Sequence, residues 1–166
     1  MNLVALLPHE QEKHRVFRTL KEIYSAERIC YVSVNKPRET LLPVLEEWLE
    51  LRSLFLVDAV TRTVQGNPEP FPNGAYVSSP GALDEIFLKV DELLASGRFG
   101  ALVFDSLCTL TSYKSEQEVT RFVHKLLARV AVAKCEGIFL CVRPVVQESF
   151  IEELHQLADR VVHFDR

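Results

Sequence analysis

Short apolar runs alternate along this chain with longer segments in which hydrophobic residues recur every three or four positions. Runs of four to six mostly apolar residues predict β-strands, and most of these runs are apolar throughout rather than at every second position. Such strands are typical of a parallel sheet that is covered on both faces. The predicted strands are Leu3–Leu7, Ile29–Val34, Leu54–Asp58, Ala75–Ser78, Ala101–Phe104, Ile138–Val142 and Arg160–Phe164.

The longer segments between these runs carry one apolar stripe each and predict amphipathic helices. They are Gln11–Tyr24, a helix that begins near Pro37, a helix from the turn at Ser79–Gly81 to about Ser96, Glu116–Cys135 and Gln147–Ala158. We expect Gly97 and Gly137 to end the helices that precede them, because glycine readily adopts the left-handed conformation at a helix end. The alternation predicts one α/β domain over residues 1–166, a three-layer α/β/α sandwich with right-handed crossovers and a mostly parallel sheet.

One stretch breaks the pattern. Thr61–Gly74 contains several glycines and prolines and predicts a surface loop, with Phe71 at its exposed tip. Long loops in compact domains are often functional, so we expect this loop to contact another protein.

Composition narrows the class of protein. The 166 residues carry 19 Lys and Arg against 23 Asp and Glu, a formal net charge of −4, which does not suit a protein that binds duplex nucleic acid. No apolar run reaches the roughly 20 residues that span a bilayer. Four scattered cysteines (Cys30, Cys108, Cys135 and Cys141) form no CxxC motif, and we expect reduced, buried thiols in a cytoplasmic protein.

Ligands of parallel sheets bind beyond the carboxyl ends of the strands. The candidate positions are Leu7–His9, Val34–Lys36, Asp58, Asp105–Ser106 and Arg143–Pro144. The first of them has the setting of a phosphate-binding loop, GxxxxGK[ST], and Lys13 stands at the place of the motif lysine. Leu7 and Glu12 replace the two glycines, and His14 replaces the hydroxyl residue that binds magnesium.

These replacements oppose triphosphate binding. A residue with a Cβ in the left-handed conformation costs about 1–2 kcal/mol, and phosphate loops need bare backbone whose N–H groups approach the anion. Glu10 and Glu12 place carboxylates near the phosphates, and one like-charge pair at about 4 Å costs about 4 kcal/mol at an effective dielectric of 20.

A second strand end, Ala101–Leu107, has four apolar residues followed by Asp105 and Ser106, the form of a Walker B strand. Together with Tyr31–Val34, the order of elements resembles the core ATPase domain of the RecA superfamily, in its KaiC/RadA-like branch. The resemblance aligns Lys13 with the phosphate-loop lysine and Asp105 with the Walker B aspartate, with Ser106 beside it. It also implies association into rings or filaments. Asn35 and Lys36 stand where the family carries its acidic pair, and an amide cannot act as a general base at neutral pH.

The sequence therefore predicts a non-catalytic pseudo-ATPase that regulates or assembles other proteins through protein contacts or self-association. We expect a vestigial nucleotide site at Lys13, His14, Asp105 and Ser106, and no catalytic residue, no metal and no cofactor. An alternative is a weak ATP-binding protein or ATPase that uses magnesium and ATP with Lys13, Asp105 and Arg143. Single-stranded nucleic-acid binding is a third interpretation.

Other polar residues suggest no further site. The five histidines have no metal-ligand spacing, and Cys108 is interpreted as a small buried residue rather than a reactive thiol. The cluster Lys13, Arg15, Arg18 and Lys21 is balanced by neighbouring glutamates and predicts a solvated helix face.

Overall fold

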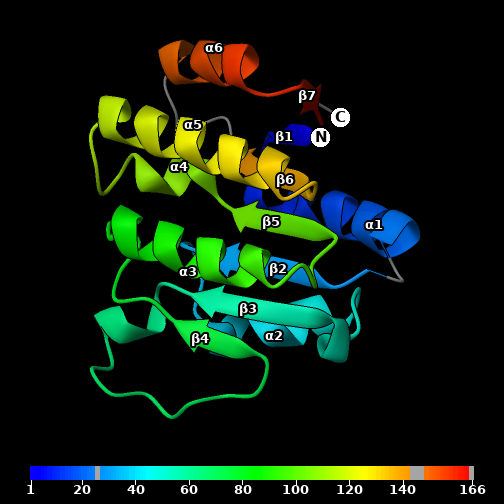
Figure 1. Cartoon of the computed structure of the whole chain (residues 1–166), viewed down its shortest axis with the longest axis vertical. Helices are drawn as coiled ribbons and strands as arrows, with labels where there is room; N and C mark the ends of the chain where they lie inside the picture. The colour runs from blue at the N-terminus through cyan, green and yellow to red at the C-terminus, as the bar shows by residue number, and fades with distance from the viewer. Residues whose placement is uncertain (25–26, 143–147, 165–166) are drawn as a thin grey trace.

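A parallel sheet forms the centre of the computed structural model, which describes residues 1–24, 27–142 and 148–164 (Figure 1). Its seven strands lie in the order β4-β3-β2-β5-β6-β1-β7, and every pairing is parallel. The strands are β1 (Asn2–Leu7), β2 (Ile29–Ser33), β3 (Leu54–Asp58), β4 (Gly74–Tyr76), β5 (Ala101–Asp105), β6 (Glu136–Val142) and β7 (Arg160–His163).

Helices cover both faces of this sheet and complete the predicted α/β/α sandwich. One face is covered by α1 and α2, and the other by α3, α4, α5 and α6 (Figure 1). The helices are α1 (Lys13–Tyr24), α2 (Arg38–Glu46), α3 (Leu83–Ala95), α4 (Leu107–Leu110), α5 (Glu116–Val132) and α6 (Glu148–Leu157), with short 3-10 turns η1 (Glu10–Glu12), η2 (Leu51–Ser53) and η3 (Thr61–Thr63). The predicted start of the last helix, Gln147, lies outside the described residues.

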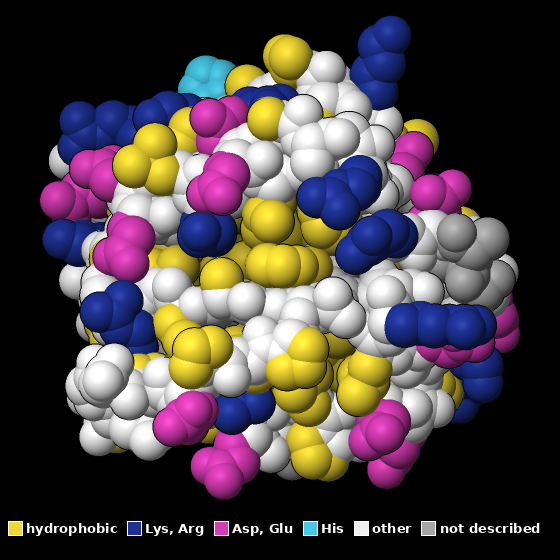
Figure 2. Space-filling model, turned by 60° about the horizontal axis from the view of Figure 1, so that its bottom comes forward, with side chains coloured by type: hydrophobic (Ala, Val, Ile, Leu, Met, Phe, Trp, Pro, Cys, Tyr) yellow, Lys and Arg dark blue, Asp and Glu magenta, His cyan; other side chains and the backbone are white. Residues whose placement is uncertain are grey.

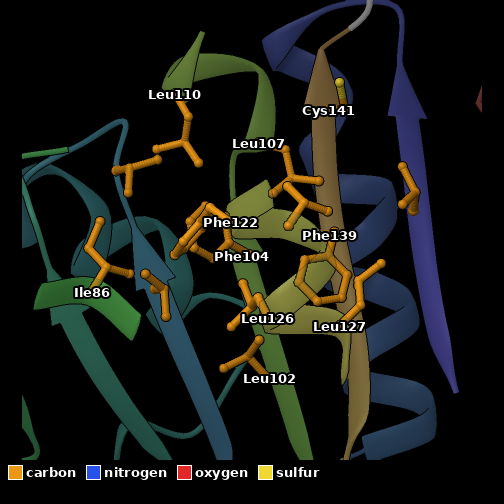
Figure 3. Close-up of a cluster of buried hydrophobic side chains, with 14 of the residues drawn as sticks. Ile86, Leu102, Phe104, Leu107, Leu110, Phe122, Leu126, Leu127, Phe139 and Cys141 are labelled. Carbon is orange, nitrogen blue, oxygen red and sulfur yellow. The ribbon is translucent and has the colours of Figure 1, made fainter. Parts of the chain in front are cut away.

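Two hydrophobic cores result, one on each face of the sheet. Successive residues of a strand point to opposite faces, so Leu102 and Phe104 of β5 join the core under α3, α5 and α6, whereas Val103 joins the core under α1 and α2. Figure 3 shows the first core, in which Phe122 of α5 packs on Phe104 with ring centroids 5.9 Å apart. Because both faces are buried, the strands need no polar alternation, which explains their continuous apolar runs.

The structure corrects one predicted helix end and confirms another. Gly97 follows α3 with φ +70°, as expected of a helix-ending glycine. Gly137 does not end α5, which stops at Val132, and Lys134 adopts the left-handed conformation with φ +57°. Gly137 lies within β6, where a Cβ would meet the Asn2 side chain at 2.5 Å. The glycine is therefore required by close strand packing rather than by a turn.

The Pro-rich stretch is largely a surface loop as predicted, but Phe71 is not at an exposed tip. Its half-buried ring lies over Gly74, packs against Tyr76 with centroids 5.1 Å apart, and receives the Arg38 guanidinium at 4.6 Å. The predicted strand Ala75–Ser78 is shifted slightly, to Gly74–Tyr76. The aromatic contacts thus fold the loop back on the edge of the sheet.

No helix within the described ranges combines the length and hydrophobicity needed to cross a membrane.

Candidate functional site

The segment that joins β1 to α1 lies at the carboxyl edge of the sheet and forms a tight 3-10 turn, η1. In this turn the Glu12 N–H donates to the His9 carbonyl at 3.1 Å, and the Lys13 N–H donates to the Glu10 carbonyl. A phosphate-binding loop instead directs such N–H groups toward the anion. Here two of these donors are already used by the backbone.

Lys13, the first residue of α1, turns inward from this segment. Its ammonium forms an ion pair with Asp105 at 2.5 Å and a second with Glu10 at 2.8 Å. The prediction that Lys13 belongs to a solvated face is wrong, because the residue is only 6% exposed, whereas Arg18 and Lys21 on the same helix are exposed. Burial of a lysine requires paired charges, and the two carboxylates provide them.

Asp105 is the other half of this buried pair and ends β5. One of its carboxylate oxygens accepts from Lys13, and the other accepts from the Tyr31 hydroxyl at 2.7 Å. The register explains this contact, since Ser33 of β2 lies opposite Asp105 and Tyr31 points to the same face two positions earlier. Both carboxylate oxygens therefore have protein donors.

Lys13 and Tyr31 both keep their protons in this network. Burial lowers the pKa of Lys13, but the charge of Asp105 and hydrogen bonds to Asp105 and Glu10 outweigh it and raise that pKa above its ordinary value. Burial, and then the Asp105 charge, raises the pKa of Tyr31 well above its ordinary value. At neutral pH the network thus holds a charged Lys13 and a protonated Tyr31.

The end of β2 also contributes to this site, through a contact between Asn35 and Glu10. The Asn35 amide, just beyond β2, donates to the second Glu10 oxygen at 2.9 Å. Asn35 was aligned with the catalytic glutamate of the RecA superfamily, and here its side chain positions a carboxylate of the altered loop. We call Glu10, Lys13, Tyr31, Asn35 and Asp105 the Lys13 network.

The other predicted site residues lie outside this network. The exposed His14 ring contacts the Gln11 carbonyl at 2.7 Å, and the Ser106 hydroxyl contacts Thr109 and Cys108, both at 2.9 Å. Of the four predicted residues, the structure joins Lys13 and Asp105 to each other. Arg143 lies outside the described residues.

A cavity of about 240 Å³ opens beside the Lys13 network, between α1 and α2. Its apolar wall is formed by Phe17, Leu41, Val44 and Trp48, and its polar lining by Glu10, Gln11, Lys13, His14, Lys36, Glu47 and Asp105. Small-molecule sites commonly occupy about 300–1,000 Å³, so this cavity is below the usual range. Among the described residues, no group of three or more His, Cys, Asp or Glu side chains could hold a metal ion.

Asp58, at the end of β3, was the other candidate carboxylate. It is fully buried and accepts hydrogen bonds from the backbone N–H groups of Arg38, Val60 and Thr61 and from the Thr61 hydroxyl. These donors bind the end of β3 to the starts of α2 and η3. Asp58 therefore has a structural role, and none of these contacts faces the cavity.

Sequence reasoning missed the contribution of Tyr31. It was identified only as the first residue of Tyr31–Val34, the segment that matches the second strand of the family pattern. A phenol in such a strand usually needs a hydrogen-bond partner, and this requirement was the available signal. The partner, on a neighbouring strand 74 positions away, could not be chosen before the strand order was known.

Comparison with known proteins places the chain by family and by fold. A model described as a family of unknown function (DUF7504) matches residues 3–164, so the chain belongs to that family. No curated protein matches the sequence. Among solved structures, a KaiC-like protein from the hyperthermophilic archaeon Pyrococcus horikoshii OT3 is similar with a TM-score of 0.67 and 15% identity, over 98% of this chain and 71% of that one. The fold is therefore RecA-like and similar to that of a KaiC-like protein.

Proposed function

We propose that this RecA-like chain is a non-catalytic member of its fold that regulates or assembles other proteins and binds no ATP at its altered phosphate loop. The observation that carries the proposal is the Lys13–Asp105 ion pair. The family resemblance assigns one residue to phosphate and the other to magnesium, and here each is the other's partner at 2.5 Å.

The charges around Lys13 support this proposal. Its ammonium is matched by Asp105 and Glu10, so the network carries one more negative than positive charge. A phosphate placed beside Lys13 would also lie beside these carboxylates, and each like-charge contact at about 4 Å costs about 4 kcal/mol at an effective dielectric of 20. Both oxygens of Asp105 already accept a hydrogen bond, one from Lys13 and one from Tyr31, so magnesium would compete with these two donors.

The surface of the molecule supports a protein partner. Figure 2 brings forward the end of the molecule that carries β4, and hydrophobic side chains gather across this face between charged ones. β4 is an edge strand of the sheet. Val64, in the loop that precedes it, is 87% exposed. An edge strand, and exposed apolar side chains on the loop that leads into it, are both typical of contact surfaces.

Nucleotide binding is tested by thermal unfolding of the whole chain with and without millimolar Mg–ATP. A ligand at about 100 times its Kd adds about 2.7 kcal/mol, which at this size raises Tm by several degrees. We expect no shift and no ATP turnover. A shift that is lost in Lys13→Ala, or turnover by the pure protein, would instead establish the ATP-binding alternative.

The protein contact is tested by sizing the native protein from its own cell and identifying what elutes with it. We expect a complex larger than the monomer that Val64→Asp weakens. The matched control is Val132→Asp, because Val132 is 77% exposed at the end of α5, outside the loop. A monomeric elution profile that neither variant changes would contradict the proposal.

A further inference from the structure

Two of the four cysteines meet beneath the carboxyl edge of the sheet. Cys108 is the second residue of α4, and Cys141 lies near the end of β6, with which α4 is in contact. The two side chains are hydrogen-bonded to each other and are 2% and 0% exposed, respectively. Figure 3 shows the sulfur of Cys141 at the carboxyl end of β6.

The surroundings of Cys108 stabilise a negative sulfur. The Val142 N–H donates to Cys108 Sγ at 3.1 Å, and the Ser106 hydroxyl lies 2.9 Å from the same atom. The Cys141 hydrogen bond, with smaller contributions from Ser106, Val142 and the Lys13 charge, lowers the pKa of Cys108 to about 6 against the effect of burial. The hydrogen bond to Cys108, together with burial, raises the pKa of Cys141. These contacts therefore favour a thiolate at Cys108 and a thiol at Cys141.

The remaining cysteines provide an internal contrast. Cys30 and Cys135 are buried to a similar degree, at 0% and 2% exposed. Burial raises the pKa of Cys30 and raises that of Cys135 to about 11. Because the thiolate is the reactive form of cysteine, only the Cys108–Cys141 pair combines a thiolate with an adjacent thiol.

We propose that Cys108 and Cys141 are a redox site, at which a hydroperoxide oxidises Cys108 and Cys141 then closes an intramolecular disulfide. In the first step the Cys108 sulfur attacks one oxygen of hydrogen peroxide, the O–O bond breaks, and protonation of the departing oxygen gives water and Cys108 sulfenic acid. In the second step the Cys141 sulfur attacks the sulfenic sulfur, and the hydroxyl leaves as water with the Cys141 proton. The Cys108 thiolate and the Cys141 thiol together lose two electrons and one proton, solvent supplies the proton of the first step, and one peroxide becomes two waters.

The burial of the pair defines which oxidants act on it. Only a small reagent reaches a sulfur that is 2% exposed, so hydrogen peroxide reacts and bulky aromatic disulfides react slowly. Ser106 follows Asp105 directly and contacts Cys108, so the disulfide forms next to the Lys13 network. The site differs from the Lys13–Asp105 pair, and its test does not depend on whether ATP binds.

The test treats the native protein with hydrogen peroxide and follows intact mass and cysteine-containing peptides. We expect a product about 2 Da lighter in which the peptides of Cys108 and Cys141 are linked, with Cys30 and Cys135 still free as internal controls. The initial rate should rise with pH around a midpoint near 6, the pKa of Cys108. A thiol with an ordinary pKa would give a midpoint near 8.5.

Two substitutions separate the roles of the sulfurs. In Cys141→Ser the sulfenic acid should persist on Cys108 and be trapped by dimedone, whereas Cys108→Ser should give neither adduct nor disulfide. The wild-type peptide map decides the proposal even if either variant folds poorly. The proposal fails if peroxide oxidises Cys108 no faster than Cys30 and Cys135, or if the disulfide joins a different pair.

Discussion

Asp58 and Asp105 end two strands of the same sheet, and both are buried, at 0% and 1% exposed. Asp58 is held by uncharged donors that lie nearby in the chain or at the start of α2. Asp105 is held by the ammonium of Lys13, 92 positions away, and by Tyr31 from the neighbouring strand. The first carboxylate is satisfied mainly by backbone geometry, and the second by side chains of other elements.

The contrast shows two ways in which a fold accommodates a buried charge. Backbone donors form with the turn itself, so Asp58 needs no second charge. Asp105 instead depends on one lysine whose own burial requires the carboxylate. Such reciprocal dependence leaves no unpaired positive charge at Lys13 for a phosphate, which is the physical basis of the proposed loss of nucleotide binding.

The largest effect is expected for Lys13→Ala. Removing one partner of a buried ion pair costs about 3–5 kcal/mol, because the remaining charge is uncompensated. Urea unfolding should show this loss in the free energy of unfolding, with partial recovery in Lys13→Met/Asp105→Asn, which leaves no unpaired Asp105 charge. Equal stability of Lys13→Ala and wild type would show that Asp105 does not need its partner.

A smaller loss of stability is expected when one hydroxyl that donates to Asp105 or to Asp58 is removed, and the two losses should differ. Tyr31→Phe removes one of the two partners of Asp105, and hydrogen bonds to charged groups contribute about 1.5–3 kcal/mol. Thr61→Val removes one of four donors to Asp58, so we expect a cost of about 1 kcal/mol. Urea unfolding of both variants tests the ranking, and the reverse order would remove the distinction drawn between the two sites.

The smallest expected effect is the change in unfolding free energy with pH that comes from the Lys13 charge. The pKa of Lys13 is raised in the folded state, so its contribution to stability is complete below the ordinary value of 10.5 and is lost as pH rises beyond it. We expect unfolding free energies from pH 7 to 11.5 to fall more steeply for wild type than for Lys13→Met/Asp105→Asn, by at most about 1.4 kcal/mol per pH unit. Parallel curves would contradict the raised pKa.

Much of the fold was predictable because the strands are buried on both faces. Leu54–Asp58 was predicted to the residue, since a continuous apolar run requires only local information. The end of α5 was not, because Lys134 adopts a left-handed conformation that sequence rules assign to glycine. Phe71 was misplaced because its contacts with Gly74 and Arg38 depend on tertiary structure.

The candidate site was predicted only as separate pieces. Motif spacing identified Lys13 and Asp105, but no local rule states that they bind each other. Their contact depends on the order of the strands, as does that of Cys108 with Cys141. Motif spacing thus located Lys13 and Asp105 one at a time, and topology determined that they bind each other.

The position of β1 in the sheet has a consequence for synthesis of the chain on the ribosome. β1 pairs with β6 and β7, both of which follow it by more than 120 residues, so its pairing waits until residues 136–163 are translated. At about 5–20 residues per second, this interval lasts on the order of ten seconds. During that time the apolar segment Leu3–Leu7 lacks the strands that cover it in the folded sheet, and its hydrophobic surface is exposed to aggregation.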